Sequence, residues 1–499
     1  MEPAGTSPLS ALYEPADLDS SALVFGDDEW SYRRLHDVGR ALAGHLAPLS
    51  GERVAFMLPN CPEAVLLYLA CWRSGAVAVP LNLRYAAPEL KRVLGRCRPR
   101  LLVVHESRLG LLADLPSDVL APVRVSVVGD PGSSGFEPFS SLAEPAADPA
   151  AVPASHADRA AVIFFTSGST GEPKGVVHTH GSVRGILDST SEALGNITAG
   201  DVLQVSDPLV HISGFMETMT GLVRGAEVVL YDGFDLPTYV AGLRAHRPTL
   251  VCTHLDVLAQ LSRDRNADAD WFSSFRGVYT GGDTVPAAVQ RDFSTRFGQS
   301  IAVGYGMTEA IWLTVSRTGR LDRDGCIGEP VGGAEIRRHE QTGELLARGP
   351  MVMQGYWEDD ELTRAMLADG WLHTGDIGSQ DTTGTWWYEG RIKDLIVRRT
   401  SKITPGEVES AIVLHPAVAA AAVVAADDTE EGQVPVAFVV AKDGESLSAE
   451  TLTEFLRDRI AAYKLPARVH FVDALPLTAS GKIAHRELRE PSGYGKPPD

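Results

Sequence analysis

The chain has 499 residues, of which 44% are hydrophobic and 22% are charged. This length predicts more than one domain, and this composition is typical of a soluble globular protein. A net charge of −20 disfavours a nonspecific nucleic-acid or anionic-membrane surface. The sequence contains no CxxC pair, no recognisable signal-peptide pattern and no apolar run of membrane-spanning length. We therefore expect a cytoplasmic protein without disulfides, nucleic-acid partners or a membrane span.

The first part of the chain alternates between strand and helix patterns. Predicted strands lie at 54–58, 76–81 and 101–104, and predicted helices lie at 62–73 and 88–97. Alternation at this spacing predicts a parallel sheet covered by helices. The stretch 130–155 is rich in Pro, Gly, Ser and Ala, and it is interpreted as a linker.

A glycine-rich loop follows this predicted linker. An apolar strand at 160–165 changes abruptly to the sequence TSGSTGEPKG at 166–175. Glycines allow backbone N–H groups to approach an anion, while hydroxyls and Lys174 add donors and charge. The spacing is not that of a Walker A loop, because Pro173 replaces a glycine and Gly175 follows the lysine. The loop indicates nucleotide binding, with a flexible surface connection as the alternative.

The alternation then resumes and predicts a second doubly wound unit. Predicted strands lie at 202–205, 227–230, 249–252, 277–280 and 300–303, and predicted helices at 182–193, 215–223, 237–246, 255–263 and 286–297. Ligands of such sheets gather at the carboxyl ends of the strands. The clusters at 166–175, 281–283 and 304–309 follow predicted strands. A dinucleotide GxGxxG motif fails in the last cluster, because Glu309 stands where its third glycine belongs.

Beyond Gly325 the pattern changes to short strands and turns, which predicts a small β-rich subdomain. Charges crowd between 388 and 405, and a new apolar pattern begins at Val408. The predicted α/β fold therefore has a large N-terminal domain, residues 1–390, of two doubly wound subdomains and the β-rich subdomain. A small C-terminal α+β domain, 391–499, follows a hinge near 391–394.

Five stretches together resemble the adenylate-forming superfamily, which includes acyl-CoA synthetases. They are TSGSTGEPKG at 166–175, YGMTE at 305–309, GWLHTGD at 370–376, GRIKD at 390–394 and PLTASGKI at 476–483. The resemblance covers nearly the whole chain, in the family's order. It implies a reaction in which a carboxylate attacks ATP, pyrophosphate leaves, and a thiol takes the acyl group. Such a reaction joins anions, so cations and amide donors must stabilise the developing charge.

The resemblance also assigns roles to residues. The phosphates of ATP would be held by Thr166, Ser167, Gly168, Ser169, Thr170, Gly171 and Lys174. The adenine would lie against Gly281, Gly282, Asp283, Tyr305, Gly306 and Met307. Thr308 would contact the α-phosphate, Glu309 would bind Mg²⁺, and Asp376 would accept hydrogen bonds from the ribose hydroxyls. Arg391 would approach the ribose or a phosphate from the hinge side. Lys482 would bridge the carboxylate and the α-phosphate, and His211 would border the acyl pocket; we count both, with Thr308 and Glu309, as catalytic candidates.

Two further features come from the family's domain motion and substrate pocket. Lys393 occupies the hinge about which the mobile C-terminal domain rotates, unless it is one charge in a solvated run. Phe215, Met216 and Trp312 would line a pocket for a hydrophobic acid, although such residues are more often core. An amino-acid substrate is disfavoured, because no Asp lies between His211 and Met216 to pair with an ammonium group.

The segment after the hinge departs from the family pattern. Many relatives carry Gly-Gly or Lys-Gly in this segment, where this chain has side chains, including those of Arg399 and Thr400. This puts the usual passage of the thiol in doubt, although Arg398, Arg399 and Lys402 could engage phosphates of coenzyme A. A solvated basic run is the alternative.

The leading hypothesis is an ATP- and Mg²⁺-dependent ligase that joins a fatty, alicyclic or aryl acid to coenzyme A. One alternative is an enzyme that loads a separate carrier protein, and another retains a single half-reaction. A noncatalytic binding protein is disfavoured, because the phosphate, ribose and lysine residues of the family are all present. The oligomeric state is left open, with a homodimer as one option.

Overall fold

The computed structural model describes residues 17–144, 156–167, 173–282, 284–321, 324–399, 401–442, 444–476 and 483–489. The chain divides into two compact units. Unit 1 contains residues up to 321 together with 327–336 and 347–372, and unit 2 contains 322–326, 337–346 and the chain from 373 onward. The predicted domain bounds, 1–390 and 391–499, stay a prediction. Within the described ranges, no helix is long and apolar enough to cross a membrane.

The first sheet of unit 1 has the strand order β19-β9-β8-β4-β3-β5-β6-β7. Its strands are β3 (Arg53–Met57), β4 (Val77–Pro80), β5 (Leu101–His105), β6 (Arg124–Val128), β7 (Glu137–Pro138), β8 (Ala160–Ser167), β9 (Pro173–Thr179) and β19 (Gly355–Tyr356). Strands β3 to β6 pair in parallel, as predicted from the alternation. In contrast, β8 and β9 form an antiparallel hairpin, and β19 adds to it antiparallel.

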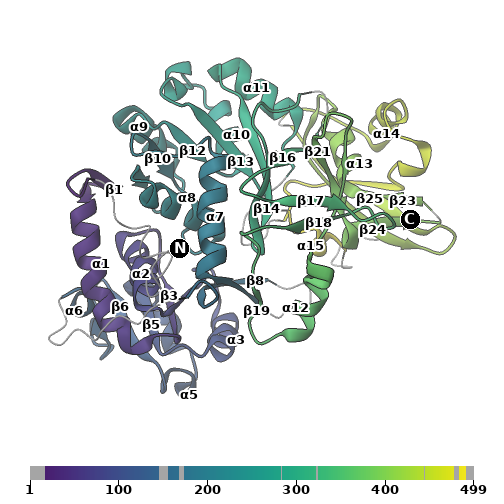
Figure 1. Ribbon diagram of the computed structural model, residues 1–499. Coiled ribbons are helices and arrows are strands. Elements are labelled where there is room, and N and C mark those ends of the chain that lie inside the picture. Colours follow the sequence, from purple (N-terminus) through teal and green to yellow (C-terminus); the bar gives the residue numbers. More distant parts are fainter. Residues whose placement is uncertain are drawn as a thin grey trace. The chain divides into compact units, whose positions relative to one another are not determined.

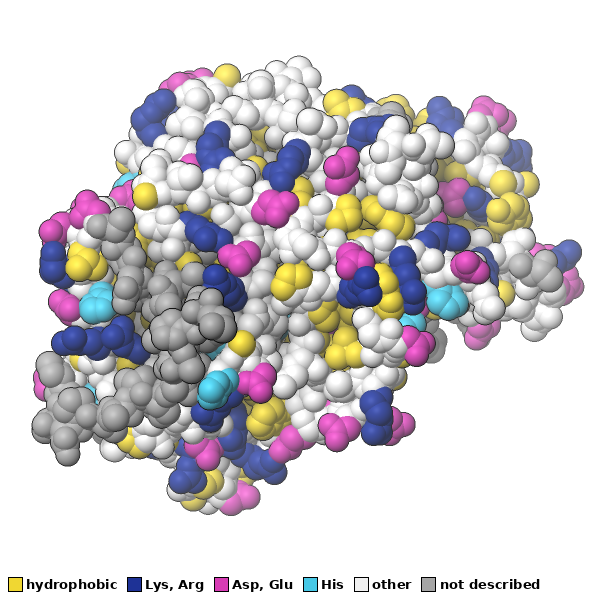
Figure 2. All heavy atoms as spheres, viewed as in Figure 1, with side chains coloured by type: hydrophobic (Ala, Val, Ile, Leu, Met, Phe, Trp, Pro, Cys, Tyr) yellow, Lys and Arg dark blue, Asp and Glu magenta, His cyan; other side chains and the backbone are white. Residues whose placement is uncertain are grey.

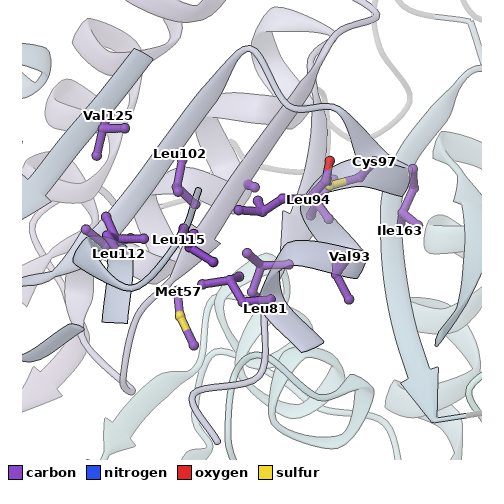
Figure 3. Packing of buried hydrophobic residues seen from close by; sticks show 14 of the residues in the cluster. Met57, Leu81, Val93, Leu94, Cys97, Leu102, Leu112, Leu115, Val125 and Ile163 are labelled. Carbon is purple, nitrogen blue, oxygen red and sulfur yellow. Dashed lines mark hydrogen bonds between the residues drawn. The ribbon is translucent and has the colours of Figure 1, made fainter. Parts of the chain in front are cut away.

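Helices α1 (Tyr32–Leu46), α2 (Pro62–Ser74) and α3 (Ala87–Cys97) accompany this sheet, and α1 packs beside α2 (Figure 1). Helix α2 begins with a proline and ends at Gly75, whose φ of 74° closes the helix in the left-handed region. Apolar side chains of α3 meet those of β3, β4 and β5 in one cluster, which includes Met57, Leu81, Leu94 and Leu102 (Figure 3). The predicted parallel sheet covered by helices is thus confirmed for this part of the chain.

The predicted linker is wrong over part of its length. Strand β7 extends the sheet by pairing with β6, and the short helix α6 (Ser140–Ala143) follows it. Phe139 and Leu142 are buried and anchor the segment. Its Gly- and Ser-rich composition conceals these anchors, because two buried apolar residues are too few to create a periodic signal. Residues 145–155 lie outside the described ranges.

The second sheet of unit 1 contains the order β16-β15-β14-β13-β12-β10-β11-β1-β2. Its strands are β1 (Ser21–Phe25), β2 (Asp28–Ser31), β10 (Val202–Val205), β11 (Glu227–Leu230), β12 (Leu250–Cys252), β13 (Gly277–Gly281), β14 (Ile301–Met307), β15 (Ala310–Ser316) and β16 (Cys326–Pro330). The series from β11 to β14 is parallel. Strand β14 continues to Met307, beyond its predicted end at 303, because it pairs antiparallel with β15.

Several helices pack against this sheet. They are α7 (His180–Ala193), α8 (Ile212–Val223), α9 (Leu236–His246), α10 (Leu255–Arg263) and α11 (Ala287–Phe297). One face is covered by α9, α10 and α11, whose apolar side chains join Val251, Val278 and Ile301 in a second core cluster. Helix α8 packs on β10 and β11, and α7 packs on β15. The doubly wound prediction is confirmed for unit 1.

Unit 2 contains β21, most of β20 and parts of β17 and β18, in the strand order β17-β18-β20-β21, and a separate C-terminal sheet. The first group is β17 (Glu335–Arg338), β18 (Glu344–Arg348), β20 (Leu372–Gln380) and β21 (Trp386–Arg391). The second group is β22 (Ile396–Arg398), β23 (Ser401–Ile403), β24 (Val418–Asp428), β25 (Gly432–Ala441) and β26 (Arg468–Phe471), with helices α13 (Pro405–Val413), α14 (Ala449–Arg457) and α15 (His485–Arg489). Ile403, Ile412, Val423 and Val439 belong to the core of this C-terminal sheet.

Charged side chains are spread over the surface. On the face shown in Figure 2, acidic and basic side chains are interspersed, and the described residues form no extended basic patch there.

Candidate active site

The predicted phosphate loop connects the two strands of the β8–β9 hairpin. Thr166 pairs with Lys174 across the hairpin, and the backbone of Ser167 pairs with Pro173. The hairpin therefore brings the two ends of the loop side by side. The remaining predicted loop residues, Gly168, Ser169, Thr170 and Gly171, lie outside the described residues, as does the side chain of Ser167.

Glu309, the predicted Mg²⁺ ligand, is held by a tyrosine that the sequence analysis did not single out. The hydroxyl of Tyr356 donates to Oε1 of Glu309 at 2.6 Å. The N–H of Met353 donates to the Glu309 carbonyl at 2.8 Å. The carboxylate of Glu309 follows β14 and is half-buried. Tyr356 leaves the second carboxylate oxygen for another partner.

Thr308 is tied to the phosphate-loop hairpin by His178 on β9. The ring Nε2 of His178 lies 2.8 Å from the Thr308 carbonyl, and Nδ1 lies 3.2 Å from the Ser182 hydroxyl. Burial lowers the pKa of His178 to about 4, so the ring is neutral at pH 7. A carbonyl can only accept, so Nε2 carries the proton and Nδ1 accepts from Ser182.

Glycines at the ends of β13 and β14 allow close backbone contact. A Cβ at Gly281 would lie 2.8 Å from the Gly304 carbonyl oxygen, and one at Gly304 would overlap the Trp312 ring. Trp312 has a left-handed φ of 50° and is 3% exposed. Its indole nitrogen lacks a hydrogen-bond partner within the described part of the chain. Tyr305, Gly306 and Met307 also lie on β14, so these predicted adenine-binding residues are strand residues; Gly282 follows β13, and Asp283 lies outside the described residues.

Helix α8 carries three of the predicted pocket residues. His211 caps its N-terminus, and the backbone N–H of His211 donates to the Pro208 carbonyl. Phe215 is fully buried, with its ring packed against Tyr68, Trp72 and Phe164. The sulfur of Met216 lies 3.8 Å from the Thr190 hydroxyl. Phe215 is therefore a core residue, and the pocket role of all three stays a prediction.

Two buried carboxyl groups flank this pocket segment. Asp207 is 4% exposed, and one of its carboxylate oxygens lies 3.4 Å from Nε2 of His254. Glu217 is a residue of α8 itself and is 1% exposed. Burial raises the pKa of both carboxyl groups above their ordinary values. Neither lies between His211 and Met216. The exclusion of an amino-acid substrate therefore stays a prediction.

In unit 2, Asp376 faces Arg391 across the β20–β21 hairpin. Nε of Arg391 lies 3.1 Å from Oδ1 of Asp376, which is 3% exposed. Glu344 fixes the preceding turn, because it accepts from the Gly375 N–H at 2.9 Å and lies 3.0 Å from Nδ1 of His373. The two predicted ribose residues are thus brought together within one hairpin.

The predicted hinge residue Lys393 lies in a short 3₁₀ turn, Ile392–Asp394, and is exposed. The neighbouring Asp394 accepts from Nη2 of Arg489 at 3.2 Å. Lys482, the predicted catalytic lysine, lies outside the described residues. Nothing in this single arrangement tests rotation at the hinge.

Two family models match the chain. The AMP-binding enzyme model matches residues 15–357, and the C-terminal domain model of AMP-binding enzymes matches residues 407–482. The chain belongs to the AMP-binding enzyme family. A 3-[(3aS,4S,7aS)-7a-methyl-1,5-dioxo-octahydro-1H-inden-4-yl]propanoyl:CoA ligase of Rhodococcus jostii is 33% identical over 94% of this chain and 95% of that protein. An indoleacetate–CoA ligase of Aromatoleum aromaticum is 34% identical over 94% of each chain.

The fold agrees with a solved structure of similar length. The crystal structure of ATP-bound MatB from Rhodopseudomonas palustris matches with a TM-score of 0.89 and 26% identity over 97% of this chain and 98% of that one. The match extends over almost the whole of both chains, so the resemblance inferred from five short stretches is confirmed at the level of the family.

In this AMP-binding enzyme, the segment that departs from the family pattern after the hinge contains a turn that is held by ion pairs. Arg399 has a left-handed φ of 55°, and its side chain pairs with Glu431. Arg398 also pairs with Glu431, at 2.7 Å, and donates to the Tyr463 carbonyl. Both arginines are already paired to a carboxylate, which weakens the hypothesis that they engage phosphates of coenzyme A; Lys402 is exposed.

Sequence reasoning missed the residues that orient the predicted site residues of this AMP-binding enzyme. Tyr356, His178 and Glu344 each contact a predicted site residue or its backbone. The sequence offered one usable signal for His178, the HxH pattern at 178–180, which lies next to the loop; it has no third ligand candidate nearby in the sequence and so does not indicate a zinc site. Tyr356 and Glu344 lie outside the five stretches that resemble the family, and no motif marks either of them as a site residue.

Proposed function

We propose that this protein is an ATP-dependent acyl-CoA synthetase that converts a hydrophobic carboxylic acid to its acyl adenylate and then to its CoA thioester. The carrying observation is the match, over nine-tenths of both chains, to CoA ligases of two different hydrophobic acids. One relative acts on an alicyclic propanoate and the other on indoleacetate. An aryl or alicyclic acid is the substrate class that we propose for this chain.

The site residues supply what the first step requires. Lys174 and the loop donors would hold the terminal phosphates of ATP, and Asp376 would accept hydrogen bonds from the ribose hydroxyls. Lys482 would neutralise the approaching carboxylate and the α-phosphate. The acid's carboxylate oxygen attacks phosphorus, the bond to pyrophosphate breaks, and a thiolate later displaces AMP from the acyl carbon.

Mg²⁺ fits the donor set around Glu309. No three His, Cys, Asp or Glu side chains of the described ranges gather to hold a metal by themselves. Mg²⁺ is commonly held by one or two carboxylates together with substrate phosphates, and Glu309 offers one such carboxylate. When bound, the ion would neutralise phosphate charge during adenylation.

The acceptor and cellular setting are also proposals. We propose coenzyme A as the acceptor in preference to a carrier protein, because the relatives are CoA ligases. A cytoplasmic location and a homodimer stay predictions.

The test is pyrophosphate release with ATP and Mg²⁺ over a panel of aryl, alicyclic, fatty and amino acids, with mass detection of CoA thioesters. We expect release and thioester with an aryl or alicyclic acid. Release of pyrophosphate without a CoA thioester would indicate that the acceptor is not coenzyme A. Absence of release with every acid, followed by absence of thioester from a synthetic acyl adenylate, would overturn the proposal.

A further inference from the structure

Tyr356 contacts both Glu309 and Lys174, two residues that the proposed adenylation step needs together. Its hydroxyl donates to Oε1 of Glu309 at 2.6 Å, and Nζ of Lys174 lies 5.9 Å from the centre of its ring. Glu309 follows β14 in one sheet of unit 1, whereas Lys174 lies on β9 in the other. We propose that Tyr356 is a positioning residue that orients the Glu309 carboxylate toward a divalent cation and sets it in register with the phosphate-binding Lys174.

The backbone around Tyr356 fixes this register. Tyr356 pairs with Val176 between β19 and β9, only two residues beyond Lys174. The N–H of Trp357 donates to the Gly175 carbonyl at 2.7 Å, and the N–H of Met353 donates to the Glu309 carbonyl at 2.8 Å. The segment 353–357 therefore bonds to the exit strand of the phosphate loop and to Glu309. A shift of the exit strand of the phosphate loop would therefore move Glu309 as well.

The hydroxyl of Tyr356 is a suitable orienting donor. A phenol keeps its proton near neutral pH, and the Tyr356 hydroxyl lies within hydrogen-bond distance of Oε1 of Glu309. A neutral phenol does not cancel the negative charge of the carboxylate. With Oε1 accepting from Tyr356, Oε2 is directed elsewhere and remains able to ligate a cation, in the way that outer hydrogen bonds orient metal ligands.

The ring of Tyr356 acts separately from its hydroxyl. The ammonium of Lys174 lies over the ring face, at the outer limit of cation–π contact, and Tyr356 is 6% exposed. Tyr356→Phe removes the hydrogen bond to Glu309 while the ring, its packing and the contact with Lys174 stay. This variant therefore isolates the orientation of the carboxylate.

The experiment measures ATP binding in the absence of acid, by titration calorimetry at a series of Mg²⁺ concentrations. For Tyr356→Phe, we expect the Mg²⁺ concentration that gives half of the full effect on ATP affinity to rise by about tenfold. ATP affinity without Mg²⁺ and at saturating Mg²⁺ should remain within about twofold of wild type. Pyrophosphate release should likewise be restored by raising Mg²⁺, which a general loss of structure would not allow.

Tyr32→Phe is the matched control. The Tyr32 hydroxyl is fully buried in the same unit and lies 2.7 Å from the Ala226 carbonyl oxygen, remote in sequence from the phosphate loop. Its loss should lower the unfolding midpoint without shifting the Mg²⁺ midpoint. The inference is overturned if Tyr356→Phe leaves the Mg²⁺ midpoint within twofold of wild type, or if Tyr32→Phe shifts it equally.

This inference rests on the proposed function, because it takes ATP and Mg²⁺ as ligands, yet its failure is distinguishable. A wild-type protein that binds ATP without any response to Mg²⁺, or not at all, would contradict the proposed function. A wild-type protein that responds normally, beside an unaltered Tyr356→Phe variant, would contradict only the role of Tyr356.

Discussion

Two carboxylates that we assign to nucleotide binding are held in opposite ways. Asp376 in unit 2 is 3% exposed and pairs with the guanidinium of Arg391, whereas Glu309 in unit 1 is half-buried and accepts from the neutral phenol of Tyr356. A guanidinium neutralises its partner, and a phenol does not. Asp376 is therefore suited to accept hydrogen bonds from uncharged hydroxyls, and Glu309 to attract a cation. The partner of each carboxylate, more than its residue type, sets its task.

The largest effect should come from removing the charge of Glu309. Glu309→Gln keeps the acceptor oxygen for Tyr356 but loses the negative charge, so we expect pyrophosphate release to fall about a hundredfold. ATP affinity measured without Mg²⁺ should be unchanged or slightly tighter. Glu335→Gln, at an exposed carboxylate of the same unit that pairs with Arg348, is the control. Equal loss of ATP affinity with and without Mg²⁺ would break the comparison.

A smaller effect is expected for Asp376→Asn. The amide keeps the shape but replaces a charged acceptor, and it leaves Arg391 without its ion pair. ATP affinity should fall about tenfold, and by the same factor at every Mg²⁺ concentration, because the ribose contact does not involve the cation. Asp381→Asn in the next turn, which accepts from the Trp387 indole, is the matched control. A loss confined to the Mg²⁺-bound nucleotide would contradict the assignment.

The hydrogen bond from the neutral His178 ring to the Thr308 carbonyl predicts that the stability of unit 1 depends on pH. Burial lowers the pKa of His178 from 6.5 to about 4, so between these values the unfolded chain binds more protons than the folded protein. The contribution to stability is therefore complete above about pH 6.5 and is lost as pH falls toward 4. Thermal unfolding of His178→Gln, whose amide does not titrate, should depend less steeply on pH across this window. An equal or steeper dependence would contradict the role given to His178.

The smallest effect is expected at Arg399 in unit 2, in the turn that is held by ion pairs to Glu431. Arg399→Gly relieves a left-handed residue, a strain of about 1 kcal/mol, and loses an exposed ion pair that contributes little. The unfolding midpoint should rise by about 1 to 2 °C, and the KM for coenzyme A should change by less than about threefold. Arg247→Gly, at another left-handed arginine, is the control. A KM increase beyond threefold only in Arg399→Gly would indicate that Arg399 binds the phosphates.

Much of the fold could be predicted from local patterns. Strands near residues 54, 101 and 202 and helices near 62 and 255 lie within a few residues of their predicted bounds, because burial imposes a period of two or 3.6 on the chain. The predicted end of β14 at 303 is wrong, since its glycines and Tyr305 give no strand signal until β15 supplies a partner. The stretch 137–143 lies within the predicted linker at 130–155, and its buried Phe139 and Leu142 make it part of the fold.

The sequence by itself determined the family, through five short stretches whose glycines, hydroxyls, lysines and carboxylates suit a nucleotide. Tertiary structure alone decided how those groups are held. The hydrogen bond from Tyr356 joins residues 47 positions apart, and that from His178 spans 130 positions. Contacts at such separations have no local period or spacing, because each joins a strand of one sheet of unit 1 to the end of a strand in the other sheet, and the two come from distant parts of the chain.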